Sequence, residues 1–142
     1  MADPTLRALF AARLMQARQL RALSQRALGD RMGLGKQKGS SRINRYEHQV
    51  TAIGFDNLEA LAKILDVPPA YLVADNATMA DAILALARAK PRQQEQLKDL
   101  LALLTAEPAL TKSLLALLDK GKPSKALRDR LKALADEPGA TP

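Results

Sequence analysis

The residues best suited to chemistry in this 142-residue chain form a run of small polar and arginine side chains at positions 40–49. On a helix through this run, Ile43, Tyr46 and Glu47 would share one side, leaving polar residues on the other. Serine, asparagine and arginine side chains can hydrogen-bond to base edges and phosphates, although a solvated helix face would show the same pattern. The candidate base-contacting residues are Ser40, Ser41, Arg42, Asn44 and Arg45.

Other kinds of chemistry find little support. The chain has no cysteine and a single histidine, His48, so disulfides, thiolate catalysis and zinc sites built from Cys or several His are excluded. We find no nucleophile beside a base, no glycine-rich phosphate loop next to a strand and no carboxylate cluster. We therefore expect no enzymatic activity, no metal and no cofactor.

The positive charge is concentrated near the N-terminus. Residues 1–53 carry ten Lys and Arg against three Asp and Glu, whereas residues 54–142 are neutral in sum. Such a basic segment favours an anionic partner, either nucleic acid or a membrane surface. Residues 92–118 have mixed charge and no aromatic anchors, which disfavours membrane binding. The N-terminus has no signal-peptide pattern, so a cytoplasmic protein is expected.

The first part of the chain is predicted to form short helices. Asp3 and Pro4 predict the start of a helix whose apolar residues run from Leu6 to Leu20. Ser24 predicts the start of a second helix that runs through Met32 and is ended by Gly33. Gly29 suits a close crossing of two helices.

Three further elements follow before residue 75. Ser40 or Ser41 would cap a helix over Arg42–His48, and Asp56 with Glu59 forms a capping-box pattern for a fourth helix. Pro68-Pro69 then breaks the chain before a last short turn at residues 70–73. Because no alternating strand pattern is present, the predicted fold class is all-α.

The order of these elements carries a family resemblance. Arg18 lies six residues before Ser24, and the segments LSQRALGDRMGL, INRYE and LEALAKILDVPPAYL follow. Together they resemble the lambda-repressor-like, Cro/Xre-type helix-turn-helix family over roughly residues 6–75. The resemblance implies a five-helix domain that binds double-stranded DNA. It also implies base reading by residues 40, 41 and 45, a phosphate or base-assisting role for Gln25, and a structural pair between Arg18 and Glu47.

The sequence departs from the family pattern in two places. Eight residues separate Leu34 from Ile43, more than the family usually has. This longer connection adds two lysines, at positions 36 and 38, near the expected DNA groove. In the family, a glycine usually follows the Arg-Tyr-Glu segment closely, whereas this chain has His48-Gln49-Val50 there. The candidate phosphate-contacting residues are Gln25, Lys36, Lys38 and Gln49.

The C-terminal part is rich in leucine and alanine. Proline recurs at positions 91, 108, 123 and 138, and the first three precede amphipathic runs, as expected at helix starts. With a further helix at residues 81–90, we expect three or four antiparallel helices. Leu-Leu-Ala-Leu-Leu occurs at 100–104 and again at 114–118, which fits either a structural repeat or a simple compositional bias.

These helices have apolar faces too wide for so small a unit, so they need partner surface, either from the first domain or from a second copy. We expect a homodimer through Leu97, Leu100, Leu101, Leu104, Leu114, Leu117 and Leu118. The expected division is a DNA-binding domain at 1–75, a helical interaction region at 77–137 and a tail at 138–142. The predicted function is a transcriptional regulator, more specifically a repressor on a pseudo-palindromic operator. The alternative is an antitoxin-like or adaptor protein whose C-terminal helices bind another protein.

Overall fold

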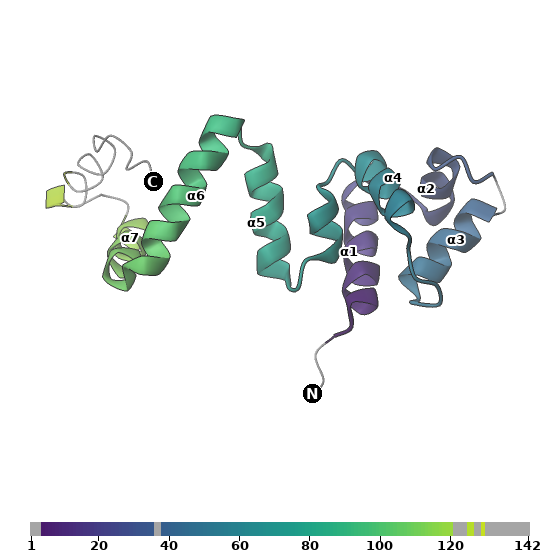
Figure 1. Cartoon of the computed structure of the whole chain (residues 1–142), viewed down its shortest axis with the longest axis horizontal. Helices are drawn as coiled ribbons and strands as arrows, with labels where there is room; N and C mark the ends of the chain where they lie inside the picture. The colour runs from purple at the N-terminus through teal and green to yellow at the C-terminus, as the bar shows by residue number, and fades with distance from the viewer. Residues whose placement is uncertain (1–3, 36–37, 121–124, 127–128, 130–142) are drawn as a thin grey trace. The chain divides into compact units, whose positions relative to one another are not determined.

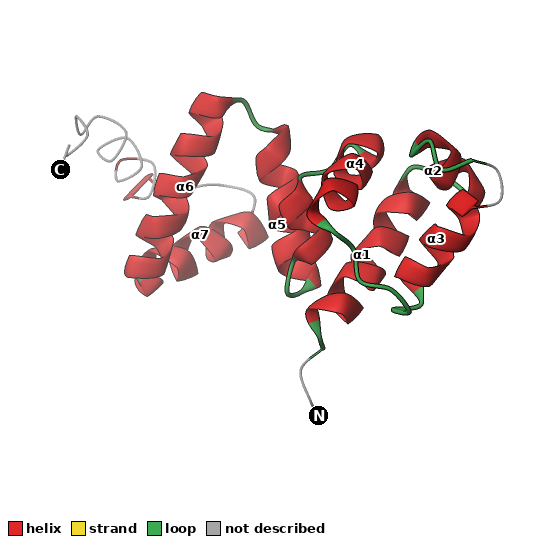
Figure 2. Ribbon diagram, turned by 45° about the vertical axis from the view of Figure 1, so that its right-hand side comes forward, coloured by secondary structure: helices red, strands yellow, loops and turns green. Residues whose placement is uncertain are grey.

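The structure, a computed structural model, describes residues 4–35, 38–120, 125–126 and 129, with the side chains of 118–120 excepted. The described chain contains only helices and loops (Figure 2), which confirms the all-α prediction. It divides into two compact units, residues 1–91 and 92–142. The helices are α1 (Leu6–Leu20), α2 (Gln25–Arg31), α3 (Lys38–Glu47), α4 (Phe55–Leu65), the 3-10 helix η1 (Pro69–Val73), α5 (Ala77–Arg88), α6 (Pro91–Ala106) and α7 (Pro108–Lys120) (Figure 1).

The first two helices begin at hydroxyl caps. Thr5 Oγ1 accepts a hydrogen bond from Ala8 N at 3.3 Å, so Pro4 lies before the cap and the start predicted at Asp3 and Pro4 is wrong. Ser24 caps α2 as predicted, with its Oγ 3.0 Å from Ala27 N. Gly33, at a φ of 73°, follows α2 in the left-handed region, also as predicted.

Helix α3 begins at Lys38, one turn earlier than predicted. Ser40 and Ser41 therefore lie inside the helix rather than at its cap. The reason is a tertiary contact in which Gly39 packs backbone to backbone against Gly29 of α2. A Cβ on Gly39 would lie 2.8 Å from the Gly29 backbone, closer than side-chain carbons approach, so both positions require glycine for this crossing.

Helix α4 also starts differently from the prediction. Gly54 is its N-cap and makes no side-chain hydrogen bond, while Asp56 lies within the first turn. Glu59 does not close a capping box but forms an ion pair with Lys63, one turn further on, at 2.6 Å. The predicted capping box is therefore wrong, although the predicted inner stripe of α4 does face the core.

One hydrophobic core joins α1, α2, α3, α4, η1 and α5. Its largest fully buried side chains are Leu14, Leu28, Ile43, Leu61, Leu65 and Leu72. Leu6 and Leu20, the first and last of the apolar residues predicted along α1, are 62% and 69% exposed because they lie at its two ends. At the far end of α1, Arg21 donates to the Leu65 carbonyl and to Asp66, which ties α1 to the C-terminus of α4.

Helix α5 belongs to the first compact unit. It begins at Ala77, earlier than the predicted helix at 81–90, because Asn76 Oδ1 accepts from Met79 N at 2.8 Å and caps it. Ala80 is buried in the core, with Ile83 and Leu84 packed against it. The boundary expected between residues 75 and 77 therefore falls inside this unit, which extends to residue 91.

Helices α6 and α7, which form most of the described second unit, begin at Pro91 and Pro108, as the proline spacing predicts. The chain turns by 113° between them, short of the antiparallel arrangement we expected. No side chain of α6 is buried. The third predicted run, residues 127–134, lies almost wholly outside the described residues. Within the described part, no single helix is long and apolar enough to cross a membrane; α6 and α7 would meet that test only as a bent pair.

The glycine contact between α2 and α3 gives a first prediction. Alanine in a helix interior usually stabilises by about 0.5–1 kcal/mol relative to glycine. For Gly39→Ala we expect the opposite, a loss of about 1–3 kcal/mol, because the new Cβ overpacks the crossing. Urea unfolding monitored by circular dichroism measures this. Ser41→Ala is the control, since Ser41 is an exposed residue of the same helix and its replacement adds no volume at the crossing. Equal effects of the two substitutions would contradict the prediction.

Candidate nucleic-acid interface

A buried carboxylate holds α3 against the two helices that precede it. Arg18 donates to Glu47 through two bonds, Nε to Oε1 at 2.6 Å and Nη2 to Oε2 at 3.1 Å. Gln25 Nε2 donates to the same Oε2 at 2.7 Å. The Glu47 side chain is 1% exposed and that of Arg18 is 16% exposed. The two residues that the family resemblance pairs are thus in bidentate contact, and the contact fixes α3 relative to α1 and α2.

Gln25 extends this network to the outer side of α3. Its Oε1 accepts from Asn44 Nδ2 at 3.4 Å while its Nε2 is bonded to Glu47. Gln25 is half-buried, whereas Asn44 is exposed. The phosphate contact predicted for Gln25 therefore competes with two internal bonds, and Gln25 also orients Asn44.

The two faces of α3 separate as the sequence pattern predicts. Gly39, Ile43, Tyr46 and Glu47 are buried. On the outer face of α3 and just after it, the exposed candidate contact residues are Lys38, Ser41, Arg42, Asn44, Arg45 and Gln49. Ser40 is half-buried. Lys36 lies outside the described residues. His48 is exposed and its Nδ1 lies 2.9 Å from the Asn44 carbonyl.

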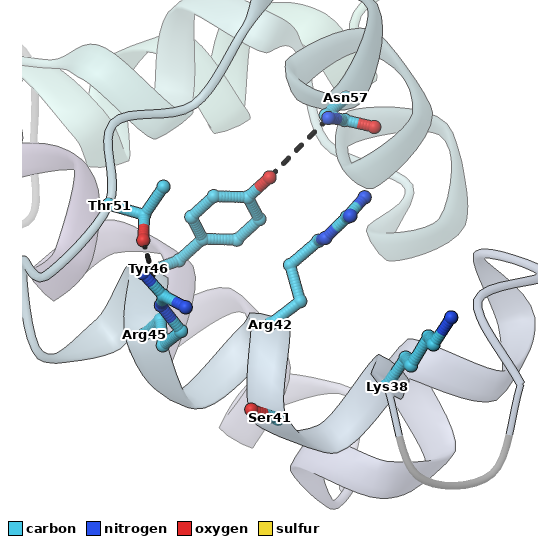
Figure 3. A pocket seen from close by; sticks show the side chains of 7 residues that line it. All are labelled: Lys38, Ser41, Arg42, Arg45, Tyr46, Thr51 and Asn57. Atoms are coloured by element: carbon cyan, nitrogen blue, oxygen red, sulfur yellow. Dashed lines mark hydrogen bonds between the residues drawn. The ribbon is translucent and has the colours of Figure 1, made fainter.

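An open groove of about 590 Å³ runs along one edge of α3 (Figure 3). Three cationic side chains of α3, Lys38, Arg42 and Arg45, line it together with Ser41. The opposite wall comes from Thr51 and Asn57, which lie after α3. No carboxylate lines this groove. Its shape and charge therefore suit an extended anion.

The groove is anchored to the core through Tyr46. The Tyr46 hydroxyl accepts a hydrogen bond from Asn57 Nδ2 at 3.4 Å, which links α3 to α4 (Figure 3). The Tyr46 ring meets Phe10 edge to face, with 6.1 Å between ring centroids. One side chain thus joins the wall of the groove to α1, and the groove is expected to keep its form when a ligand enters.

The loop after α3 returns to one of the groove arginines. Gln49 adopts a left-handed φ of 61°, at the place where the family usually has a glycine. The chain then turns so that Thr51 Oγ1 accepts from Arg45 Nε at 3.0 Å. Thr51 and Asn57 were both missed as groove residues by sequence reasoning. Only the three-dimensional path of the loop brings them to α3.

The electrostatics of α3 favour an anionic ligand. Lys38 and Arg42 are four residues apart and Arg45 is three further on, so like charges repeat along one edge. The first turn of α3 contains no acidic residue, although the helix N-terminus is the positive end of the dipole. This arrangement is unfavourable in isolation, and a bound phosphate chain would relieve it.

The fold and groove define the class of this protein. A helix-turn-helix family model matches residues 14–72. The chain belongs to the Cro/C1-type helix-turn-helix family and is a DNA-binding transcriptional regulator.

A solved structure gives a particular relative. The chain is similar to the transcriptional regulator BswR, with 31% identity and a TM-score of 0.62, over 68% of this chain and 96% of that one. No curated protein sequence matches significantly. Within the described residues, no group of three or more His, Asp or Glu side chains could hold a metal ion.

The buried pair provides the prediction for this site. Glu47→Gln removes the charge that Arg18 needs, and breaking a buried pair costs about 3–5 kcal/mol. We expect a loss near the lower end of that range, since Arg18 is partly exposed, and it is read from urea unfolding. Glu59→Gln breaks an exposed pair on α4 and should leave stability close to wild type. Similar losses in both variants would contradict a special role for Glu47.

Proposed function

We propose that this regulator is a repressor that binds a pseudo-palindromic operator as a homodimer. The observation that carries the proposal is the exposed cationic edge of α3, held rigidly by the buried contact between Arg18 and Glu47. A dimer that occupies an operator can block transcription by occupancy alone. This function places the protein in the cytoplasm, where the operator is.

In this proposal, α3 lies in the major groove and its exposed side chains read base edges. Arg42 and Arg45 offer donor pairs that match guanine O6 and N7, and Asn44 offers an amide that matches adenine. Ser40 and Ser41 can donate to either kind of base. Lys38, at the start of α3, would contact phosphate, as would Gln49 in the loop after the helix and Lys36.

The homodimer is supported by the exposed leucines of α6. Leu97, Leu100 and Leu101 of α6 are exposed, whereas Leu104, Leu114 and Leu117 are half-buried. The side chain of Leu118 lies outside the described residues. Covering such leucines with a second copy would remove apolar surface from water. It would also bring two α3 helices to adjacent half-sites, which raises affinity.

Base reading and phosphate contact have different signatures. We expect Arg42→Ala and Arg45→Ala each to weaken binding to a high-affinity duplex selected from random sequence by about 1–3 kcal/mol, while binding to unselected DNA changes little. Lys38→Ala should weaken both alike and reduce the slope of log K against log salt by about one. The duplex is obtained by selection from random sequence, and fluorescence anisotropy at several salt concentrations gives the affinities.

Lys63→Ala is the control for these variants, because Lys63 lies on α4 in an exposed ion pair with Glu59 and does not line the groove. The slope of log K against log salt for Lys63→Ala should equal that of wild type. If neither arginine variant changes affinity for the selected duplex, the assignment of α3 as the reading helix is wrong.

The dimer is tested with a charge placed on α6. Leu101 is 64% exposed, so Leu101→Asp should preserve the helix yet prevent apolar association. We expect wild type to sediment as a dimer at micromolar concentration and Leu101→Asp as a monomer. Leu20→Asp, at a similarly exposed leucine of α1, should remain dimeric.

Two outcomes would overturn the homodimer. Wild type that sediments as a monomer would remove it directly. A stoichiometric second protein that co-purifies with wild type and is lost from Leu101→Asp would favour the alternative, in which the exposed leucines of α6 bind another protein and DNA binding serves autoregulation.

A further inference from the structure

Thr51 is bound to one groove arginine through both its side chain and its main chain. Its Oγ1 accepts from Arg45 Nε at 3.0 Å. Its amide donates to the Arg45 carbonyl at 3.4 Å, and the amide of Val50 donates to the same carbonyl at 2.8 Å. The loop after α3 is therefore closed onto the residue that we propose reads a base.

This contact decides which part of the guanidinium is left for DNA. A guanidinium presents its donors in a rigid planar fork. With Nε bonded to Thr51, the two Nη groups remain as an end-on pair, and within the described chain Arg45 forms no ion pair with a carboxylate. Both Arg45 and Thr51 line the groove (Figure 3).

The identity of Thr51 suits such a holding role. Threonine is β-branched and therefore stiff at χ1, so its hydroxyl has few alternative positions. Thr51 is half-buried, which restricts it further, whereas Arg45 is exposed and would otherwise sample many rotamers. Ordering the arginine before DNA arrives lowers the conformational entropy that binding must remove.

We propose that Thr51 is a positioning residue that sets the base specificity of Arg45. Its hydroxyl holds Nε so that the Nη pair faces guanine O6 and N7 in the major groove. This inference rests on the proposed reading role of α3. Thr51 itself is not required to touch the DNA.

The test compares Thr51→Val, which keeps the shape but removes the hydroxyl, with Thr51→Ser, which keeps the hydroxyl. The base pair read by Arg45 is first identified as the one where Arg45→Ala no longer discriminates among base substitutions. At that pair, Thr51→Val should lower the preference for guanine about 3- to 10-fold, the usual effect of losing one hydrogen bond. Thr51→Ser should restore most of the preference, and preferences at the other pairs should stay as in wild type.

A double-mutant cycle separates positioning from a direct contact. Adding Thr51→Val to Arg45→Ala should change affinity no further, because the hydroxyl then has no arginine to hold. Thr78→Val, at an exposed threonine of α5, is the matched control and should bind as wild type.

Three results would overturn the inference: undiminished guanine preference in Thr51→Val, no rescue by Thr51→Ser, or a full effect of Thr51→Val without Arg45. If instead Arg45→Ala discriminates normally at every pair, Arg45 reads no base and the inference about Thr51 fails with it. The proposed function of α3 fails only if Arg42→Ala also leaves binding unchanged.

Discussion

The arrangement of the helix-turn-helix depends on one buried charge. Glu47 is almost fully removed from solvent, and a carboxylate in that position is stable only if it is fully hydrogen-bonded and paired. Its partners, Arg18 and Gln25, come from two different helices. Any change in the angle of α3 would break at least one of these bonds, so the charge acts as a geometric constraint. The outer face of α3 is rigid because the inner face has so little freedom.

The same helix therefore carries charges of two kinds. The inner carboxylate is balanced within the protein, whereas the cationic side chains of Lys38, Arg42 and Arg45 along the groove are not balanced by a carboxylate there. Balanced charges contribute to folding, and unbalanced ones are available to a ligand. Tyr46 and Asn57 connect the two regions, because their hydrogen bond links the groove wall to residues packed on Phe10.

Local signals were sufficient for much of the fold. Ser24 and Gly33 mark the ends of α2 through capping chemistry that involves only neighbouring residues, and the prolines mark α6 and α7 in the same way. Predictions failed where distant residues decide. The start of α3 is set by the packing of Gly39 on Gly29, and α5 joins the first unit because Ala80 enters its core. Arginine and serine types suggested the reading face, but Thr51 joins it only through the path of a loop.

The contact between Gly29 and Gly39 couples α2 and α3, so that neither helix can be replaced without regard to the other. Exchanging reading helices between relatives is a natural way to look for altered DNA preference. Here such an exchange would fail at the packing level unless the donor helix brings a glycine at the same place. The longer connection between Leu34 and Ile43 is thus not a free insertion, since Gly39 within it supplies one half of this crossing. New specificity is more readily sought by changing the outward side chains alone than by transplanting the whole helix.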